Sequence, residues 1–319
     1  MSPFTAIRAQ SVSARGERRL IGEIRRWLGR VSPKSPAGIG DDCAVLPPTK
    51  CQQLITTDPV LYGQHFDDKV PPRAAGAKLL KRNLSDIASM GGRPVAAVVS
   101  LALAPDTRTG WLREFYLGLA ACARRYGVKI VGGDITEGPR GFFGAFLSLH
   151  GEATGRRVLT RGGARAGDGI YVTGTLGGSR RRHHYDFTPR LAEGAWLARR
   201  PEVCAMMDLS DGLAKDLDSL TPEGLAPALS AAAIPVSAAA RAGAKRSQQS
   251  PLSHALRDGE DYELLLVVRA RAGHAKLERD WKKRFPKVKL TAIGTFVRQD
   301  RMPADALRLA NYRGYEHLR

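Results

Sequence analysis

The feature of this sequence that most constrains its fold is the alternation of short apolar runs with longer segments of helical period. Such alternation favours a layered architecture in which helices cover the faces of a sheet. The 319 residues suffice for two domains of ordinary size, so we expect two α+β halves that join near 153–160. The expected strands are 52–58, 95–103, 128–134, 142–153, 168–174, 204–212, 262–268 and 290–297, and the expected helices are 17–29, 72–90, 108–126, 190–199, 273–284 and 302–310. The composition of 221–256 allows no assignment.

The N-terminus and the cysteines indicate an untargeted cytoplasmic protein. Residues 1–20 lack the apolar core and cleavage site of a secretory signal. We expect residues 1–16 to be a loose, untargeted arm, and the alternative is a weak organelle-targeting peptide. No run of about 18 apolar residues occurs, and no membrane-spanning helix is expected. The cysteines are scattered, without a CxxC pair, at positions 43, 51, 122 and 204. This spacing disfavours a zinc site or a disulfide framework and favours reduced thiols.

The formal net charge of +19 is unusual, with 50 Lys and Arg against 31 Asp and Glu. Such an excess fits a nucleic-acid-binding protein, an enzyme that acts on anionic substrates, or an Arg-rich surface that is merely solvated. Charge alone leaves these three readings open.

A subset of the scarce carboxylates shares a setting. Its members lie at the end of an expected strand or in a turn that contains glycine, where backbone can approach a ligand closely. The members of this set are Asp41, Asp42, Asp58, Asp134, Asp208 and Asp211. Each also has an ordinary structural explanation, because aspartates stabilise turns and begin helices. One more carboxylate, Asp86, lies within an otherwise apolar helical segment, where it needs a cation or several hydrogen-bond donors. Helical spacing puts Asn83 on the same face, so both side chains can point to one site.

Many carboxylates in a basic protein suit metal-assisted phosphoryl transfer. Mg²⁺ takes oxygen ligands, a few carboxylates together with substrate phosphates. In such reactions the protein mainly positions the groups and neutralises their charge. No GxxxxGK[ST] sequence occurs, which excludes a P-loop enzyme. The sequence therefore predicts a nucleotide site of another construction.

Eight motifs in sequence order resemble the thiamine-monophosphate kinase family, whose superfamily includes aminoimidazole ribonucleotide synthetase and selenophosphate synthetase. The resemblance extends from about residue 17 to the C-terminal GYEHL (314–318). The motifs are GIGDDCAVL (38–46), ITTD (55–58) with His65 seven residues later, NLSDIASMGG (83–92), VGGDIT (131–136), TRGGARAGD (160–168), VTGTLG (172–177), DLSDGL (208–213) and GEDYELL (259–265). The resemblance implies a two-domain PurM-like α+β fold, with a mixed sheet in the N-terminal domain and an α/β C-terminal domain. The implied division is an arm at 1–16, an N-terminal domain at 17–153 that carries metal, ATP and dimer contacts, and a C-terminal domain at 154–319.

The resemblance also implies site residues. The implied ligands of several Mg²⁺ ions are Asp42, Thr56, Thr57, Asp58, Asp86, Asp134, Asp208 and Asp211. The implied ATP contacts are Gly133, Asp134, Arg161, Ser210 and, in less specific surroundings, Tyr116. The implied contacts to thiamine monophosphate are His65, Glu260 and Tyr315. Taken alone, Arg161 would be one surface arginine among many, and His65 and Tyr315 would be packing residues.

The implied reaction needs no general base. The acceptor is a phosphate monoester whose second pKa lies near 6, so it is largely ionised at neutral pH. What remains is the repulsion of two anions, which bound Mg²⁺ ions would remove. Arg161 is the candidate catalytic residue, because its guanidinium could hold the polyphosphate through a forked contact.

The sequence departs from the family pattern on the acceptor side. RRRHHYDFTPR (180–190) replaces a longer helical stretch, DPVLYGQHF (58–66) replaces a more apolar stretch, and Asp258 stands where the family has glycine. The basic 180–184 could be a solvated loop, a phosphate contact or a weak RNA-binding patch.

We therefore expect a cytoplasmic homodimer that transfers a phosphoryl group directly from ATP to thiamine monophosphate, with no membrane or nucleic-acid partner. Two alternatives follow from the same residues. One is a superfamily relative with a different acceptor. The other is a non-catalytic basic nucleic-acid-binding protein, against which stand the intact aspartates and the lack of a nucleic-acid motif.

Overall fold

The computed structural model describes residues 1–35, 37–39, 44–312 and 314, and it divides into two compact units. The first comprises 1–87 and 93–152, and the second comprises 88–92 and 153–319. We call them the N-terminal and C-terminal units and describe each by itself. Each contains one sheet with its own helices, as the alternating pattern predicts.

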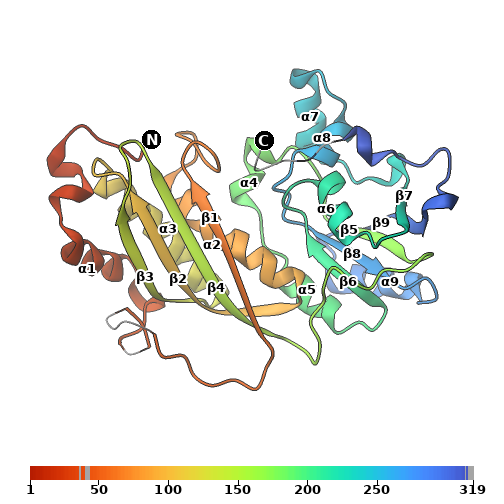
Figure 1. Cartoon of the computed structure of the whole chain (residues 1–319), viewed down its shortest axis with the longest axis horizontal. Coiled ribbons are helices and arrows are strands. Elements are labelled where there is room, and N and C mark those ends of the chain that lie inside the picture. Colours follow the sequence, from red (N-terminus) through yellow and green to blue (C-terminus); the bar gives the residue numbers. More distant parts are fainter. Residues whose placement is uncertain (36, 40–43, 313, 315–319) are drawn as a thin grey trace. The chain divides into compact units, whose positions relative to one another are not determined.

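A four-stranded mixed sheet forms the N-terminal unit, in the strand order β1-β4-β2-β3 (Figure 1). Strand β1 (Gln53–Leu61) pairs antiparallel with β4 (Phe143–Ala153), whereas β2 (Gly92–Leu103) pairs parallel with β3 (Lys129–Glu137). The mixed sheet predicted for this half is thus confirmed, and β1 and β3 are its two edges.

Helices α2 (Pro72–Ser89) and α3 (Thr109–Tyr126) cover one face of this sheet, and α1 (Glu17–Leu28) packs beside α3. The two covering helices approach each other through glycines. A Cβ on Gly76 would lie 1.9 Å from the carbonyl oxygen of Phe115, and one on Gly118 would lie 1.9 Å from that of Arg73. Larger residues at these positions would force the helices apart.

The arm at residues 1–16 is anchored on this unit rather than loose. Phe4 and Ser11 form antiparallel bridges with Thr107 and Arg108, just before α3. The indole of Trp111 donates a hydrogen bond to the carbonyl oxygen of Met1 at 3.0 Å. These bridges and hydrogen bonds attach the arm to the N-terminal unit at the start of α3.

The other face of the sheet carries exposed apolar side chains. Ile55 is 82% exposed, Phe146 is 41% exposed and Val98 is 38% exposed. They come from three neighbouring strands and alternate with residues buried under α2 and α3. Among the described residues, no helix is long and apolar enough to cross a membrane.

The C-terminal unit is built on a five-stranded sheet of order β6-β8-β5-β9-β7, in which every pair is antiparallel. The strands are β5 (Gly169–Thr173), β6 (Val203–Asp208), β7 (Leu225–Leu229), β8 (Leu264–Val268) and β9 (Leu290–Arg298). All residues of β5 and β8 are buried, which explains their uninterrupted apolar sequence. Such a run is typical of a strand covered on both faces.

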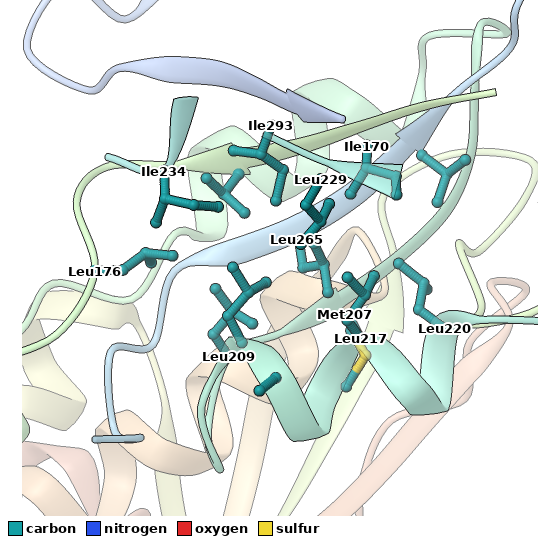
Figure 2. Packing of buried hydrophobic residues seen from close by; sticks show 14 of the residues in the cluster. Ile170, Leu176, Met207, Leu209, Leu217, Leu220, Leu229, Ile234, Leu265 and Ile293 are labelled. Atoms are coloured by element: carbon teal, nitrogen blue, oxygen red, sulfur yellow. The ribbon is translucent and has the colours of Figure 1, made fainter. Parts of the chain in front are cut away.

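Two clusters of buried side chains cover these faces. One contains Met207, Leu265, Ile170, Ile293 and Leu229, which represent all five strands (Figure 2). It includes residues of α6 (Leu213–Leu220) and α8 (Pro251–Arg257), and α7 (Ala238–Ser247) packs on α8. The other cluster includes residues of α5 (Leu191–Ala198) and α9 (His274–Arg284).

The helix expected at 302–310 is wrong. Two short 3₁₀ turns stand nearby instead, at Gln299–Arg301 and Leu309–Asn311. Pro303 disfavours helical backbone for Met302, the first residue of the expected helix, and Met302 is indeed extended. Leu307 and Leu309 pack on the core from this irregular segment, which accounts for the apolar pattern.

Candidate active site

The first group of candidate residues lies where β1 meets α2. Thr56 and Asp58 point to the same side of β1, because side chains alternate along a strand. The Thr56 hydroxyl donates to Oδ2 of Asp86 on α2 at 2.5 Å. Asn83, fully buried, donates through Nδ2 to the carbonyl oxygens of Leu79 and Asp58. Asn83 and Asp86 thus face the same strand, as their helical spacing indicates.

A buried arginine accompanies this group. Arg82 is 8% exposed, and its Nη2 lies 3.0 Å from Oδ1 of Asp58. Its Nη1 donates to the carbonyl oxygen of Pro59 at 2.7 Å. Asp58 is therefore held as an oriented carboxylate by a cation that the sequence reasoning missed. A signal was available, since Arg82 lies one helical turn before Asp86 and therefore on the same face of the helix.

Thr57 faces away from this group. Its hydroxyl donates to the carbonyl oxygen of Leu147 at 3.1 Å and accepts from Ser148 at 3.2 Å, both on β4. The side chains of Thr56 and Thr57 lie on opposite faces of the sheet, so they cannot share one ion. The ligand role of Thr57 stays a prediction.

The second group lies at the other edge of the sheet, on β3. A cavity of about 410 Å³ opens there, lined by Gly133, Asp134 and Tyr116 together with aliphatic side chains of α1. Gly133 is required by its packing, because a Cβ would lie 2.0 Å from the carbonyl oxygen of Val99. Tyr116 is buried, and burial raises the pKa of its phenol far above the usual value. The structure thus brings together three of the predicted ATP contacts.

These two groups are separated by the width of the sheet. β1 and β3 are three strand spacings apart, roughly 14 Å. A Mg²⁺ ion binds oxygen at about 2.0–2.1 Å, so one ion cannot touch both groups within this unit. Within the ranges that the structure describes, no cluster of three or more His, Cys, Asp or Glu side chains could hold a metal ion. The donors present are carboxylate and hydroxyl oxygens, which suit Mg²⁺ when phosphate or water oxygens complete the shell.

The third group is the turn after β6 in the C-terminal unit. Asp208 ends the strand, and the turn leads through Ser210 and Asp211 into α6. The buried Asp216 accepts hydrogen bonds at Oδ2 from the backbone amides of Ser210, Asp211 and Gly212, at 2.9, 3.0 and 3.1 Å. Burial and the neighbouring carboxylates raise the pKa of Asp216 to about 8. The sequence reasoning missed Asp216, although an acidic residue in the first turn of a helix is a common signal for such a role.

The loop before β8 lies against this turn. The amide of Glu260 donates to the carbonyl oxygen of Ser210 at 2.7 Å, and that of Tyr262 donates to Leu209 at 2.8 Å. Glu260 and Tyr262 have positive φ angles of 54° and 49°, a conformation that costs free energy for residues with side chains. Glu260 is therefore fixed next to Ser210, so this unit brings a predicted acceptor contact to a predicted ATP contact.

The altered segment 179–190 clamps that loop. His183 Nε2 lies 3.0 Å from the carbonyl oxygen of Asp261, and His184 Nδ1 lies 3.8 Å from Oε2 of Glu260. Phe187 stacks on Tyr262 with ring centroids 3.9 Å apart. The three arginines at 180–182 are exposed, so the solvated-loop reading fits them, whereas the histidines of α4 (His183–Asp186) pack inward.

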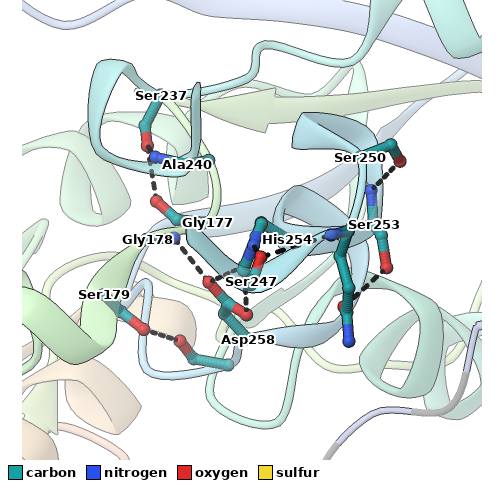
Figure 3. A network of polar contacts seen from close by, with 12 residues as sticks. Gly177, Gly178, Ser179, Ser237, Ala240, Ser247, Ser250, Ser253, His254 and Asp258 are labelled. Carbon is teal, nitrogen blue, oxygen red and sulfur yellow. Dashed lines mark hydrogen bonds and ion pairs between the residues drawn. The ribbon is translucent and has the colours of Figure 1, made fainter. Parts of the chain in front are cut away.

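A polar network supports the glycine turn that precedes this segment (Figure 3). The amide of Gly178 donates to Oδ2 of Asp258 at 2.7 Å, and the hydroxyl of Ser237 donates to the carbonyl oxygen of Gly177 at 2.5 Å. His254 Nδ1 lies 3.0 Å from both carboxylate oxygens of Asp258. Asp258, where the family pattern has glycine, therefore ties the turn to α8.

The remaining predicted residues lie apart. His65 Nδ1 accepts from the amide of Leu61 at 3.0 Å, so the neutral ring carries its proton on Nε2. Arg161 is exposed on a loop of the C-terminal unit, beside β6. Asp42 and Tyr315 lie outside the described residues, and their predicted roles are not tested.

Known proteins are similar to this chain in sequence and in fold. Residues 40–153 match the family model described as AIR synthase related protein, N-terminal domain. The chain is 35% identical over 286 residues to thiamine-monophosphate kinase of Rhodopirellula baltica, covering 85% of this chain and 87% of that protein. It is 36% identical over 271 residues to the Escherichia coli K12 enzyme of the same name, covering 77% and 81%.

Solved structures agree. Thiamine-monophosphate kinase from Stenotrophomonas maltophilia superposes with a TM-score of 0.71 at 30% identity, covering 88% of this chain and 93% of that one. The structure described as AaThiL complexed with AMPPCP and TMP superposes with a TM-score of 0.67 at 28% identity, covering 96% and 98%. HypE, a hydrogenase maturation protein, has a TM-score of 0.74 at 20% identity, covering 95% and 92%, and shares the fold alone. The predicted PurM-like fold and the family resemblance are confirmed.

Proposed function

The chain belongs to the thiamine-monophosphate kinase family, and we propose that it uses ATP to phosphorylate thiamine monophosphate, giving thiamine diphosphate and ADP. AaThiL, similar over nearly its whole length, was solved with AMPPCP and TMP. The observation that carries the proposal is the pairing of the 208–212 turn with the Glu260 loop, since it joins a predicted ATP contact to a predicted acceptor contact.

The nucleotide would enter the cavity on β3. Its aliphatic walls suit a purine ring, and the exposed backbone of Gly133 lines the same cavity. Tyr116 forms part of the same lining, and Asp134 is exposed at the rim of the strand. Arg161 and Ser210, in the C-terminal unit, are the other proposed contacts to ATP.

Magnesium ions would be held by carboxylate and hydroxyl oxygens. The proposed ligands are Thr56, Asp58 and Asp86 at one edge of the sheet, Asp134 at the other edge, Asp208 and Asp211 in the C-terminal unit, and, as further members, Asp42 and Thr57. When bound, the ions neutralise the charge of the two phosphate groups. Arg82 and Asp216 prepare this chain for that task, because the first orients the Asp58 carboxylate and the second fixes the backbone between Ser210 and Gly212.

The acceptor would lie against Glu260, with His65 and Tyr315 as further contacts. The thiazolium ring of thiamine is a cation, so the carboxylate of Glu260 would complement it. Since the acceptor phosphate is already ionised, the side chains need only position it in line with the donor.

We further propose a cytoplasmic homodimer made through the exposed face of the N-terminal sheet. The cytoplasmic location is supported by the free thiols of Cys51, Cys122 and Cys204. The dimer interface is supported by the apolar character of that face, which comes from Ile55, Phe146 and Val98. A two-fold axis along the strands, between two facing sheets, would place β1 of one copy opposite β3 of its partner. The two groups that one sheet keeps apart would then meet at the same edge of the assembly. Sedimentation velocity of the full chain measures the mass directly.

Incubation with thiamine monophosphate, ATP and Mg²⁺ tests the function. We expect thiamine diphosphate and ADP in equal amounts, separated by anion-exchange chromatography. Asp86→Asn is the control, and it should form neither product. A well-folded wild-type protein that binds ATP but phosphorylates only another acceptor would favour a superfamily relative with a different substrate.

A further inference from the structure

A second cavity lies on the N-terminal unit, away from the nucleotide cavity of β3. It measures about 440 Å³ and opens between the arm, α1 and the first turn of α3. Four arginines line it: Arg15 from the arm, Arg26 from α1, Arg108 just before α3, and Arg113 on α3. Cavities of this size commonly hold small-molecule ligands.

The charge of the cavity is strongly positive. Among its described lining residues one carboxylate occurs, Glu23, and it already pairs with Arg19 at 3.5 Å. Arg108 is partly used by the arm, because its Nη2 donates to the carbonyl oxygen of Phe4 at 3.2 Å. Arg113 Nη1 lies 3.4 Å from Glu114, a contact that is weak at this exposure. A surplus of guanidinium groups therefore faces the hollow.

The start of α3 adds backbone donors. Thr109 and Gly110, the first two residues of the helix, line the cavity, and its first turn contains no acidic residue and no side-chain cap. The first amides of a helix have no partner within it and carry part of its positive dipole. Thr109 is 7% exposed, and its Oγ1 has no hydrogen-bond partner in the part of the chain that the structure describes. The same is true of Nε of Arg15.

We propose that this cavity is a binding site for a small phosphorylated anion, distinct from the site of the proposed kinase reaction. Guanidinium groups and the amides of a helix N-terminus are donors that phosphate oxygens take. The partly exposed indole of Trp27 lines the same cavity and offers a ring face. The anion could be an inorganic polyphosphate or the phosphate part of a nucleotide.

The basic surface on α9 provides the comparison. Arg279, Lys282 and Lys283 also line a hollow, of about 500 Å³, but all of its lining residues, including the carboxylate Glu278, lie on the single helix α9. Both surfaces would attract anions over a distance, whereas the cavity beside α3 gathers its guanidinium groups from three separate segments, the arm, α1 and α3. This difference distinguishes a specific anion-binding site from the long-range attraction of anions by a basic surface.

Titration calorimetry with inorganic pyrophosphate tests the proposal, in EDTA so that metal-dependent binding at the kinase site is suppressed. We expect saturable binding by the full chain, weakened roughly tenfold or more in the double variant Arg26→Ala/Arg113→Ala. The matched control, Lys282→Ala/Lys283→Ala, should bind within about twofold of wild type.

The same titration with ADP distinguishes the two sources. Tighter binding of ADP than of pyrophosphate that is lost in Arg26→Ala/Arg113→Ala indicates a nucleotide, and equal binding indicates an inorganic anion. The proposal is overturned if wild-type protein shows no saturable binding, or if both double variants lose affinity alike. The kinase assay is a separate readout, because the Arg26→Ala/Arg113→Ala variant should keep wild-type turnover whether or not the anion site exists.

Discussion

The two units position their candidate residues in opposite ways. In the N-terminal unit these residues lie at both edges of a sheet whose second face is exposed, so the unit alone does not gather them. In the C-terminal unit, two loops bonded through their backbones hold Ser210 next to Glu260, above a sheet covered on both faces. The first arrangement relies on something outside the unit, and the second is fixed by internal contacts.

Function and stability should therefore separate differently in the two units. A substitution in the N-terminal groups should remove activity while the fold persists. A substitution in the C-terminal loops should lower both activity and stability, because the same hydrogen bonds position the candidate residues and stabilise the fold.

The largest expected effect is that of Asp58→Asn on turnover. The amide cannot replace a carboxylate as a ligand of Mg²⁺, so we expect kcat to fall by about 10³-fold or more. The fold should survive, since Arg82 keeps its bond to the carbonyl oxygen of Pro59. Steady-state kinetics and circular dichroism measure the two properties. Retained activity would refute the role of Asp58 as a metal ligand. Unfolding of the variant would contradict the expectation that substitutions in the N-terminal groups leave the fold intact.

Asp216→Ala should show the opposite behaviour. It leaves three buried or half-buried backbone amides without an acceptor, and we expect the free energy of unfolding to fall by about 3 kcal/mol. Asp218→Ala, an exposed position on the same helix, is the control and should change little. Urea denaturation measures both variants. A stability equal to wild type would mean that Asp216 does not hold the turn.

His184→Ala tests the clamp on the acceptor loop. Without the imidazole beside Glu260, we expect KM for thiamine monophosphate to rise roughly tenfold while KM for ATP stays unchanged. Arg181→Ala, exposed on the same segment, should leave both constants near wild type. An equal rise in both KM values would instead indicate a general loss of structure.

The smallest expected effect is the contribution of Asp261 to the pH dependence of the free energy of unfolding. Burial raises the pKa of this carboxyl well above its usual value, so the folded state binds its proton more tightly than the unfolded state. Stability should then decrease as pH rises above about 4, the unfolded pKa. Asp261→Asn, which can still accept from the amide of Gly177, should flatten this decrease between pH 5 and 8. Guanidinium denaturation at several pH values measures the slope, and parallel curves for the two proteins would contradict the assignment.

Most of the fold followed from the sequence because its elements obey clear periods. The helix expected at 17–29 is α1, and the apolar run at 262–268 contains β8. Local period could not anticipate 302–310, where Leu307 and Leu309 are held by the core rather than by a helix. It also gave no strand order, since pairing between distant segments depends on the whole chain.

The sequence predicted which residue types belong to the candidate site, but it did not predict which of these residues lie together in the fold. The motifs mark Thr56, Asp58 and Asp134 equally, although strand order places the last of them at the far edge of the sheet. Residues that act through others were harder to find. Arg82 and Asp216 carry no motif of their own, and their roles emerge from contacts with distant backbone and side chains.

Helix α1 forms a wall of both cavities in the N-terminal unit. Ile21, Ile24 and Leu28 face the one on β3, while Arg26 and Trp27 face the one beside α3. A ligand that moves this helix in one cavity must alter the other, and thermodynamic linkage makes the effect reciprocal. If an anion beside α3 changes the affinity for ATP by some factor, ATP changes the affinity for that anion by the same factor.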